Sequence, residues 1–503
     1  MSDLRPTVRS FYLQVAETPS PEDSARIQSL VRTLLSAAPP GLIDAIPGYT
    51  NILVEYDARF SSEAELRELL GSAPDNAESG GRQVRIPVRY DGPDLESASA
   101  ALNLTPAELI RRHSAAEYLV HAVGFTPGFP FMGSLEPALR LPRRDQPRPA
   151  VPANSVAIAD LQTGIYPLVS PGGWHLLGTS LLPVYQPGAG SPFLLEPGDM
   201  VRLEPAEGAD PAAPEALELL PAEPRTAFLR VEKPGLLDLI VDGGRPLAGR
   251  YGLARSGPLD PLSAEVANRL LGNPPFTPLL EINISGPTLE VLSDGVIAFT
   301  GWGVHLQRGT ERLEPFASHR VQAGDVLSFP PQPSGARAYL AVTGGFEVRR
   351  HLGSASPDIQ GLIGRSLRAG DVLGVVTHRK VLAGRSFRTY TNPELQSRIR
   401  LLPGPQHNPD AAAALEAGEF TVAASNRMGI QLDGPALPGG QVVSEGNPLG
   451  AIQVTPGGRP IILMNDRGTM GGYAKPALIH PADLSRVAQL RQHEPVSFVF
   501  AAG

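Results

Sequence analysis

The chain has 503 residues, which is enough for roughly three to four domains of ordinary size. Its net charge is −8, and no Lys/Arg run carries interleaved aromatic residues, so nucleic acid is a poor candidate partner. The absence of cysteine excludes a thiol nucleophile, thiolate metal ligands and disulfides. No run of 18 or more apolar residues predicts a membrane span, and the first residues lack an apolar core of signal-peptide length. We therefore expect a cytoplasmic protein that binds neither nucleic acid nor membrane.

The first 80 residues alternate strand and helix patterns. The predicted strands are Val8–Val15 and Asn51–Tyr56, and the predicted helices are Pro21–Ser36 and Ser62–Leu70. This order indicates a small α+β domain of ferredoxin-like type over residues 1–80. The acidic, glycine-rich stretch Ala73–Gly81 is predicted to be a linker.

Short strands separated by Pro and Gly turns follow, with one helical interval over Asp94–His113. Three Gly-Asp turns, at residues 198–199, 324–325 and 370–371, each precede an apolar alternation. This weak repeat agrees with several β-barrel units in succession. We expect a mainly β chain with parts at 81–222, 223–395 and 396–503, a linker at Pro205–Pro224 and a weaker boundary at Tyr390–Arg398.

Residues 444–475 form the strongest candidate site, because charged and amide side chains lie among glycines and two apolar runs. The runs Ala451–Val454 and Pro460–Met464 are too short for helices, so they are predicted to be buried strands with polar residues at their ends. Gly471 and Gly472 allow positive φ and close backbone approach to a ligand. The alternative is tight turns with a surface ion pair. The candidate residues are Glu445, Gln453, Asp466, Arg467, Thr469, Gly471, Gly472, Tyr473 and Lys475.

A second candidate cluster combines prolines, glycines and aromatic residues in Gly124–Leu135 and Thr163–Gly178. Prolines stiffen these loops, which suits a preorganised pocket with aromatic walls, although each aromatic residue could equally belong to an ordinary core. His113 and His175 could be acid/base groups or structural histidines. The candidate residues are Pro127, Gly128, Phe129, Gly172, Gly173, Trp174 and His175.

A third cluster lies within Asp238–Asn273. Asp242 and Arg245 bracket two glycines, and the amphipathic helix predicted over Pro261–Leu271 carries Asn268. Either all three side chains line a pocket, or Asn268 caps or ties down a loop.

Standard catalytic motifs are missing from the sequence. Residues 173–180 have the glycine spacing of a phosphate loop, but Thr179 stands where lysine is needed, and the segment is predicted to be a strand. No Gly-x-Gly-x-x-Gly and no Gly-x-Ser-x-Gly motif occurs, and no histidine pair has metal-ligand spacing. No preformed metal site is predicted, although Glu445 and Asp466 could converge on a metal or act as a base.

Taken together, long motifs in one order resemble the fused B and C subunits of prokaryotic 5-oxoprolinase, a family also labelled allophanate hydrolase subunits 1 and 2 and related to urea amidolyase. The motifs include Gly124-Phe125-Thr126-Pro127-Gly128-Phe129-Pro130, Ser170-Pro171-Gly172-Gly173-Trp174, Ala267-Asn268-Arg269-Leu270, Arg427-Met428-Gly429, Ser444-Glu445-Gly446 and Gly471-Gly472-Tyr473.

The resemblance implies tandem cyclophilin-like β-barrels, one after the N-terminal domain and two in the half that resembles the C subunit. It also implies ATP-dependent opening of a small cyclic amide, 5-oxoproline, to glutamate with the separate A subunit of 5-oxoprolinase. On this basis Arg427, Arg467 and Lys475 are expected to neutralise phosphate, and Glu445 or Asp466 to hold Mg²⁺ or position water. The chain departs from the family pattern at Asn154, Ala355 and Gly468, which favours a divergent member.

Two other functions stay open. The carboxyltransferase part of a biotin-dependent urea carboxylase also resembles the B and C subunits, so the chain could be the carboxyltransferase component of such an enzyme. A regulator that binds a histidine kinase is the third possibility.

Overall fold

The computed structural model describes residues 8–74, 81–377, 382–387 and 398–501. The N-terminal part is an antiparallel sheet of order β1-β3-β2 with two helices. Its elements are β1 (Val8–Gln14), α1 (Pro21–Ala37), β2 (Leu42–Pro47), β3 (Asn51–Asp57) and α2 (Glu63–Gly71). The four elements predicted from the sequence are confirmed, and β2 was missed.

The helix starts follow from capping. The side chain of Ser20 accepts a hydrogen bond from the Asp23 N–H at the start of α1, and Ser62 and Glu65 form a capping box at α2. The apolar side chains of Ile27, Leu30 and Leu34 then pack against the sheet.

The interval Asp94–His113 is two helices, α3 (Leu95–Ala101) and α4 (Pro106–Ala115), so the prediction of one helical interval is corrected. Asn103 has a φ of +56°, which ends the first helix. Thr105 then caps the second, because its Oγ1 accepts the Glu108 N–H at 3.2 Å.

A closed barrel of order β11-β4-β12-β5-β6-β9-β8 follows the N-terminal part. Its strands are β4 (Gln83–Arg89), β5 (Glu117–Val123), β6 (Pro130–Gly133), β8 (Ser155–Ala159), β9 (Gln162–Ile165), β11 (His175–Ser180) and β12 (Met200–Pro205). A separate pair joins β7 (Arg148–Val151) to β10 (Ser170–Gly172). The segment with phosphate-loop spacing is therefore largely strand β11, as predicted.

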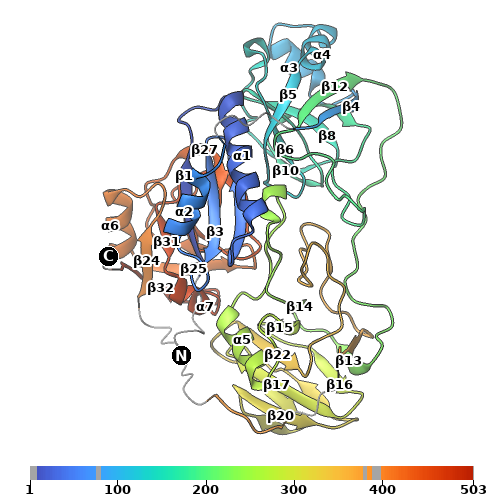
Figure 1. Cartoon of the computed structure of the whole chain (residues 1–503), viewed down its shortest axis with the longest axis vertical. Helices are drawn as coiled ribbons and strands as arrows, with labels where there is room; N and C mark the ends of the chain where they lie inside the picture. Colours follow the sequence, from blue (N-terminus) through green and yellow to red (C-terminus); the bar gives the residue numbers. More distant parts are fainter. Residues whose placement is uncertain (1–7, 75–80, 378–381, 388–397, 502–503) are drawn as a thin grey trace.

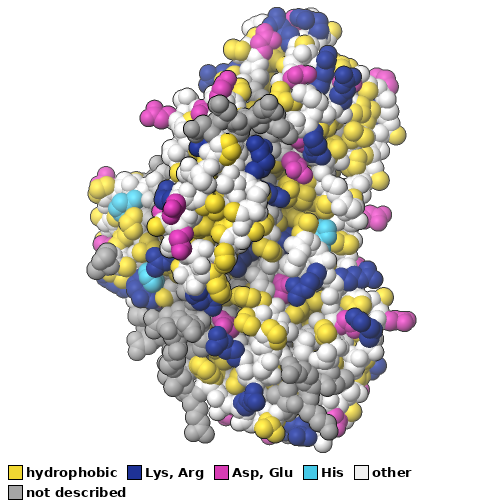
Figure 2. Space-filling model, in the orientation of Figure 1, with side chains coloured by type: hydrophobic (Ala, Val, Ile, Leu, Met, Phe, Trp, Pro, Cys, Tyr) yellow, Lys and Arg dark blue, Asp and Glu magenta, His cyan; other side chains and the backbone are white. Residues whose placement is uncertain are grey.

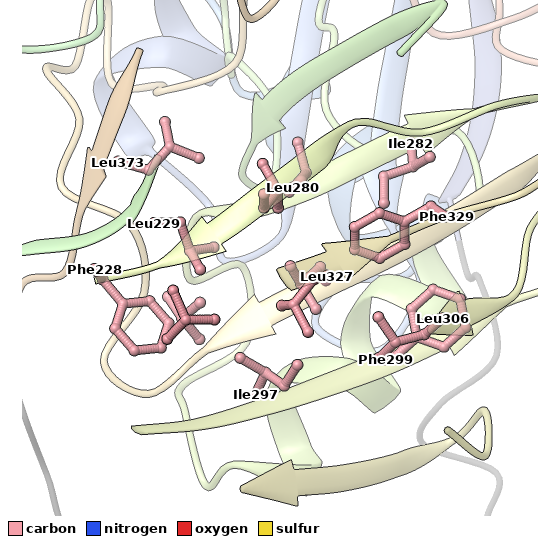
Figure 3. Close-up of a cluster of buried hydrophobic side chains, with 14 of the residues drawn as sticks. Phe228, Leu229, Leu280, Ile282, Ile297, Phe299, Leu306, Leu327, Phe329 and Leu373 are labelled. Atoms are coloured by element: carbon pink, nitrogen blue, oxygen red, sulfur yellow. The ribbon is translucent and has the colours of Figure 1, made fainter. Parts of the chain in front are cut away.

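The middle part consists of two sheets that share one apolar core. The first contains β13 (Ala227–Lys233), β16 (Thr288–Val291), β18 (Leu306–Arg308), β19 (Glu311–Leu313), β21 (Val326–Ser328) and β23 (Val372–Gly374). The second contains β14 (Leu237–Val241), β15 (Leu279–Asn283), β17 (Gly295–Gly301), β20 (Ala317–Val321) and β22 (Arg337–Val342). In Figure 3, Leu280 and Ile297 of the second sheet face Leu229 and Leu327 of the first. Helix α5 (Pro261–Leu270) packs on the second sheet.

The C-terminal part is an eight-stranded sheet with a separate two-stranded pair. The sheet contains β24 (Ile399–Pro403), β25 (Phe420–Ser425), β26 (Gly429–Asp433), β28 (Ala451–Val454), β29 (Pro460–Leu463), β31 (Ala477–Ile479), β32 (Pro495–Val496) and β33 (Phe498–Phe500). The pair is β27 (Gln441–Gly446) with β30 (Met470–Tyr473), and the helices are α6 (Pro409–Ala417) and α7 (Leu484–Val487). Both strands predicted in the first candidate cluster are confirmed.

The parts that begin and end the chain lie side by side in Figure 1, with the barrel at one end of the molecule and the middle part at the other. The fold class predicted from the sequence, mainly β with an α+β N-terminal part and tandem barrels, is confirmed. Each sheet draws its strands from one of the predicted parts, while the limits of those parts stay predictions. The predicted boundary at Tyr390–Arg398 lies almost wholly outside the described residues.

The described residues contain no helix long and apolar enough to cross a membrane. On the face drawn in Figure 2, Lys and Arg side chains are interspersed with Asp and Glu, so the described residues of that face form no continuous basic stripe.

Candidate functional site

Lys475 and Glu445, two of the predicted catalytic residues, form a buried ion pair. Lys475 Nζ lies 3.0 Å from Glu445 Oε1, and the Lys475 side chain is fully buried. The amides of Asn51 and Gln406 donate to the same carboxylate at 2.9 and 2.8 Å. Burial lowers the pKa of Lys475, and the nearby Glu445 carboxylate opposes that shift in part.

Glu445 lies at the edge of a cleft of about 350 Å³, which we call the Glu445 cleft. The cleft separates the N-terminal sheet from the loop after β24. It is lined by Ser10, Phe11, Tyr12, Gln14, Asn51, Pro403, Gly404, Pro405, Gln406, Glu445 and Leu478.

Arg427 and Asp466, the other two predicted catalytic residues, form a second buried pair. Arg427 Nε donates to Asp466 Oδ2 at 2.7 Å, and its Nη1 pairs with Glu281 of the middle part. Burial alone would lower the pKa of Arg427, but Asp466 and Glu281 raise it overall. This guanidinium therefore joins the middle and C-terminal parts.

Arg467 forms a third buried ion pair, with a carboxylate of the N-terminal sheet. Its Nη2 donates to both carboxylate oxygens of Glu55 at 2.7 and 2.8 Å, and its Nε donates to the Asn447 carbonyl at 2.6 Å. The three cations expected to bind phosphate are thus each paired with a carboxylate of the chain itself. Glu445 and Asp466 lie in separate clusters, and the described residues contain no group of three or more His, Asp or Glu placed to hold a metal ion.

The glycines of this cluster serve close packing. Gly471 and Gly472 lie in the extended strand β30, so the expectation of positive φ is wrong. A Cβ at Gly471 would lie 2.8 Å from both Asn447 Nδ2 and Gln453 Nε2, so this glycine allows close packing of the protein's own side chains, while the approach to a ligand stays a prediction. Thr469 Oγ1 is buried without a hydrogen-bond partner among the described residues, and Tyr473 ends the strand with its carbonyl 3.2 Å from Lys475 Nζ.

The second cluster forms part of a core. The ring of Phe129 packs edge-on against Trp174 and Tyr166, with centroids 5.5 and 5.1 Å apart. These side chains are buried together with Leu53 of the N-terminal sheet and Met470 of the C-terminal part. The structure therefore favours the ordinary-core interpretation over an aromatic pocket wall.

The remaining residues of that cluster make local contacts. Pro127 is buried, and the Gly128 N–H donates to the Tyr251 carbonyl at 2.8 Å. Gly172 packs against the Tyr166 hydroxyl, the Gly173 carbonyl accepts the Arg144 N–H at 2.8 Å, and His175 Nε2 bonds the Pro142 carbonyl at 2.9 Å.

The other candidate histidine, His113, is buried, and both of its ring nitrogens are hydrogen-bonded. Tyr90 and Thr163 contact its two ring nitrogens, and burial lowers the pKa of His113 to about 4. These contacts favour the structural alternative.

In the third cluster, Asp242 holds the segment that contains the unexpected Ala355. Its carboxylate accepts bonds from Ser354 Oγ at 2.6 Å, Ser356 Oγ at 2.8 Å and the Ala355 N–H at 2.9 Å. Arg245 is fully buried, and its guanidinium donates to the carbonyl of Ser356 at 2.8 Å and, at longer range, to two other carbonyls.

Asn268 ties down the loop after α5, because its Nδ2 donates to the Thr277 carbonyl at 2.9 Å. The loop interpretation of Asn268 is therefore favoured. Asp242 and Asn268 also line a hollow of about 10 Å³, which is about the space of one water molecule and does not bear out the pocket interpretation.

That hollow shares four lining residues with a larger cavity, which lies where the N-terminal, middle and C-terminal parts meet. We call this the junction cavity; its volume is about 60 Å³. It is lined by Val8, Asp57, Arg59, Gly243, Arg255, Pro258, Leu259, Pro261, Glu265, Phe276, Leu449, Met464, Asn465 and Leu484.

Sequence reasoning missed Arg255, Phe276 and Asn465 in this cavity. Two of them had a signal in the sequence: Arg255 lies in the same glycine-rich run as Arg245, and Asn465 directly precedes Asp466.

Two family models match almost the whole chain in succession. Residues 7–195 match the carboxyltransferase domain, subdomain C and D, and residues 251–500 match the carboxyltransferase domain, subdomain A and B. The chain belongs to this carboxyltransferase domain family, as the motifs indicated.

Individual relatives match the two halves separately. The chain is 41% identical to the B subunit of 5-oxoprolinase from Escherichia coli O157:H7 over 186 residues, which cover 36% of this chain and 84% of that protein. It is 33% identical to the C subunit of 5-oxoprolinase from Escherichia coli (strain K12) over 289 residues, which cover 54% of this chain and 91% of that protein. It is 30% identical to the urea amidolyase of Saccharomyces cerevisiae over 302 residues, 54% of this chain but 16% of that protein.

Among solved structures, TTHA0988 superposes with a TM-score of 0.96 at 52% identity, covering 98% of this chain and 100% of that one.

Proposed function

We propose that this chain is the fused B and C component of an ATP-dependent 5-oxoprolinase, which hydrolyses 5-oxo-L-proline to L-glutamate together with a separate A subunit in the cytoplasm. One observation carries the proposal. A single chain matches 84% of a B subunit and 91% of a C subunit.

The chemistry of the substrate explains the need for ATP. A lactam carbonyl is a poor electrophile, and transfer of the γ-phosphoryl group to its oxygen releases ADP and gives an activated imidate. Water then attacks the ring carbon, and the ring C–N bond breaks to give an acyl phosphate of the opened chain. A second water hydrolyses this acyl phosphate to glutamate and phosphate. Donors aimed at the oxygen that gains charge would lower the barrier.

The described residues do not fit a complete nucleotide and Mg²⁺ site. Arg427, Arg467 and Lys475 are already paired with carboxylates, and no cluster of three metal-binding side chains is present among the described residues. We therefore assign ATP and Mg²⁺ to the assembly with the A subunit, and this chain to binding the cyclic amide. The three buried pairs would then hold the parts around that site in register.

A second candidate function is the carboxyltransferase component of a biotin-dependent urea carboxylase. The observation that favours it is the match to urea amidolyase together with the carboxyltransferase description of both family models.

The test is reconstitution with a separately expressed A subunit. With ATP, Mg²⁺ and 5-oxoproline, we expect glutamate and ADP to form in equal amounts, and omission of either protein should abolish both. A parallel reaction supplies urea, bicarbonate, ATP and a biotinylated carboxylase. Urea-dependent ADP formation there, with no glutamate from 5-oxoproline, would replace the first function by the second.

A further inference from the structure

Arg255 is a charged side chain of the junction cavity that lacks a carboxylate partner. It is half-buried, and no Asp or Glu oxygen of the described residues lies within ion-pair distance of its guanidinium. Its hydrogen bond is a long one, from Nη2 to the Gly243 carbonyl at 3.4 Å. Burial lowers the pKa of Arg255, while Glu55 opposes that shift. A desolvated cation of this kind gains most from an anion that enters the cavity.

The other charged side chains that line the cavity are already engaged. Arg59 Nη2 lies 2.6 Å from Asp57 Oδ2, and Glu265 pairs with Arg269 at 2.7 Å. Arg59 also approaches Glu265 at 3.9 Å. The unbalanced charge on the described cavity wall is therefore the guanidinium of Arg255.

Asn465 supplies a complementary acceptor in the same cavity. Its Nδ2 donates to the carbonyls of Ser256 and Pro258 at 3.1 and 2.9 Å, so the side-chain amide is held in one orientation. Its Oδ1 receives no hydrogen bond from the described residues and can accept an N–H group from a ligand.

Apolar groups complete the wall. Phe276 lies over Gly243, where a Cβ would come within 2.7 Å of its ring, and the backbone φ of Phe276 is +61°. Met464 and Leu259 also line the cavity. These surfaces suit the methylene groups of a small ring.

We propose that the junction cavity binds a small amide that carries a carboxylate, with Arg255 holding the carboxylate and Asn465 Oδ1 accepting the amide N–H. The inference rests on the proposed function and deepens it. 5-Oxoproline has both groups, whereas urea has N–H groups but no carboxylate. Arg255 is then the residue that selects the acidic cyclic amide over urea.

The experiment measures binding to the complete chain by calorimetry. The ligands are 5-oxoproline, 2-pyrrolidinone, which is the same ring without the carboxylate, and urea. The wild-type chain is expected to prefer 5-oxoproline, and R255M to bind it roughly tenfold to hundredfold more weakly, the range for a lost charged hydrogen bond. R255K should retain part of the affinity. R230M is the control, since Arg230 pairs with Glu290 on strands remote from the cavity.

Turnover in the assembly with the A subunit separates the two proposals. A wild-type assembly that makes glutamate while R255M keeps the wild-type KM would overturn the role of Arg255 and leave the proposed function intact. Loss of 5-oxoproline binding in R255M without any glutamate formation by the wild type would support the carboxylate site and remove the function. Equal binding of 5-oxoproline and 2-pyrrolidinone to the wild type would overturn the inference even if R255M failed to fold.

Discussion

Lys475 is a fully buried cation whose charge is balanced by one carboxylate. Glu445 pairs with Lys475 and also accepts hydrogen bonds from the amides of Asn51 and Gln406, so the two residues act as a structural unit as well as candidates for chemistry. The same holds for Arg427 with Asp466 and Glu281, and for Arg467 with Glu55. Breaking such a pair leaves an uncompensated buried charge.

Replacing Lys475 by Met tests this role. We expect K475M to lower the free energy of unfolding by about 3–5 kcal/mol, because the Glu445 carboxylate then remains buried without its cation. The double variant K475M/E445Q should recover much of that loss. Urea denaturation followed by circular dichroism measures both, and R230M at an exposed pair should change stability far less. Additive losses in the double variant would contradict the proposed coupling.

Sequence reasoning located these charged residues but not their partners. Glu445, Asp466, Arg467 and Lys475 cluster in the chain and are buried or half-buried in the structure. Glu55, however, lies 412 residues from Arg467, and Asn51 lies 394 residues from Glu445. Which charges pair across such separations depends on how the parts pack, and local patterns contain no information about that.

At the scale of elements, the Gly-Asp turns show what a short pattern can predict. Gly198, Gly324 and Gly370 all have φ between +88° and +98°, and each is followed by the predicted strand. In every copy the aspartate N–H donates to the carbonyl of the residue three positions earlier, and the aspartate carboxylate accepts the N–H of that same residue. The turn chemistry is local, so sequence alone was sufficient. Strand β2 was missed because its six residues lack a clear alternation.

Replacing Gly324 by Ala tests the turn. No atom lies within 4 Å of the added Cβ, so the cost comes from the backbone conformation alone. We expect a loss of about 1–2 kcal/mol in the free energy of unfolding, the usual cost of left-handed backbone for a residue with a Cβ. Gly188→Ala is the matched control, because its Cβ also meets nothing and its φ is not positive. Equal stabilities of the two variants in denaturation would show that the turn tolerates a side chain.

At the scale of the whole molecule, separate barrels are joined by shared cores and buried polar contacts. One core contains side chains of the N-terminal sheet, the barrel and the C-terminal part, and the junction cavity lies where the N-terminal, middle and C-terminal parts meet. The sequence predicted the order of the parts from turns and periodicity. It could not predict the cavity, because Arg255, Phe276 and Asn465 come together only when those parts are packed.

Asp44 provides a pH test of this packing, because it joins β2 to the middle part. Its Oδ2 accepts the Gly249 N–H at 2.8 Å, and the side chain is buried. Burial, reinforced by Glu55, raises the pKa of Asp44 from 3.8 to about 7. At a pH between these two pKa values, the Asp44 carboxyl is protonated in the folded chain and ionised in the unfolded chain. The free energy of unfolding therefore falls as the pH rises from about 4 to about 7, by up to about 4 kcal/mol from this group.

Asp44→Asn removes that titration. The variant should gain stability relative to the wild type on going from pH 5 to pH 8, whatever the substitution itself costs in free energy of unfolding at every pH. The pKa of His121 is lowered to about 4, like that of His113, and both give the opposite slope at acid pH. They are unchanged in the variant, so their effect cancels in the difference. Denaturation at both pH values provides the measurement, with the exposed Asp210→Asn as control. A difference between variant and wild type that is the same at pH 5 and pH 8 would mean that Asp44 is ionised in the folded protein, and that the contact between β2 and the middle part is more hydrated than its burial indicates.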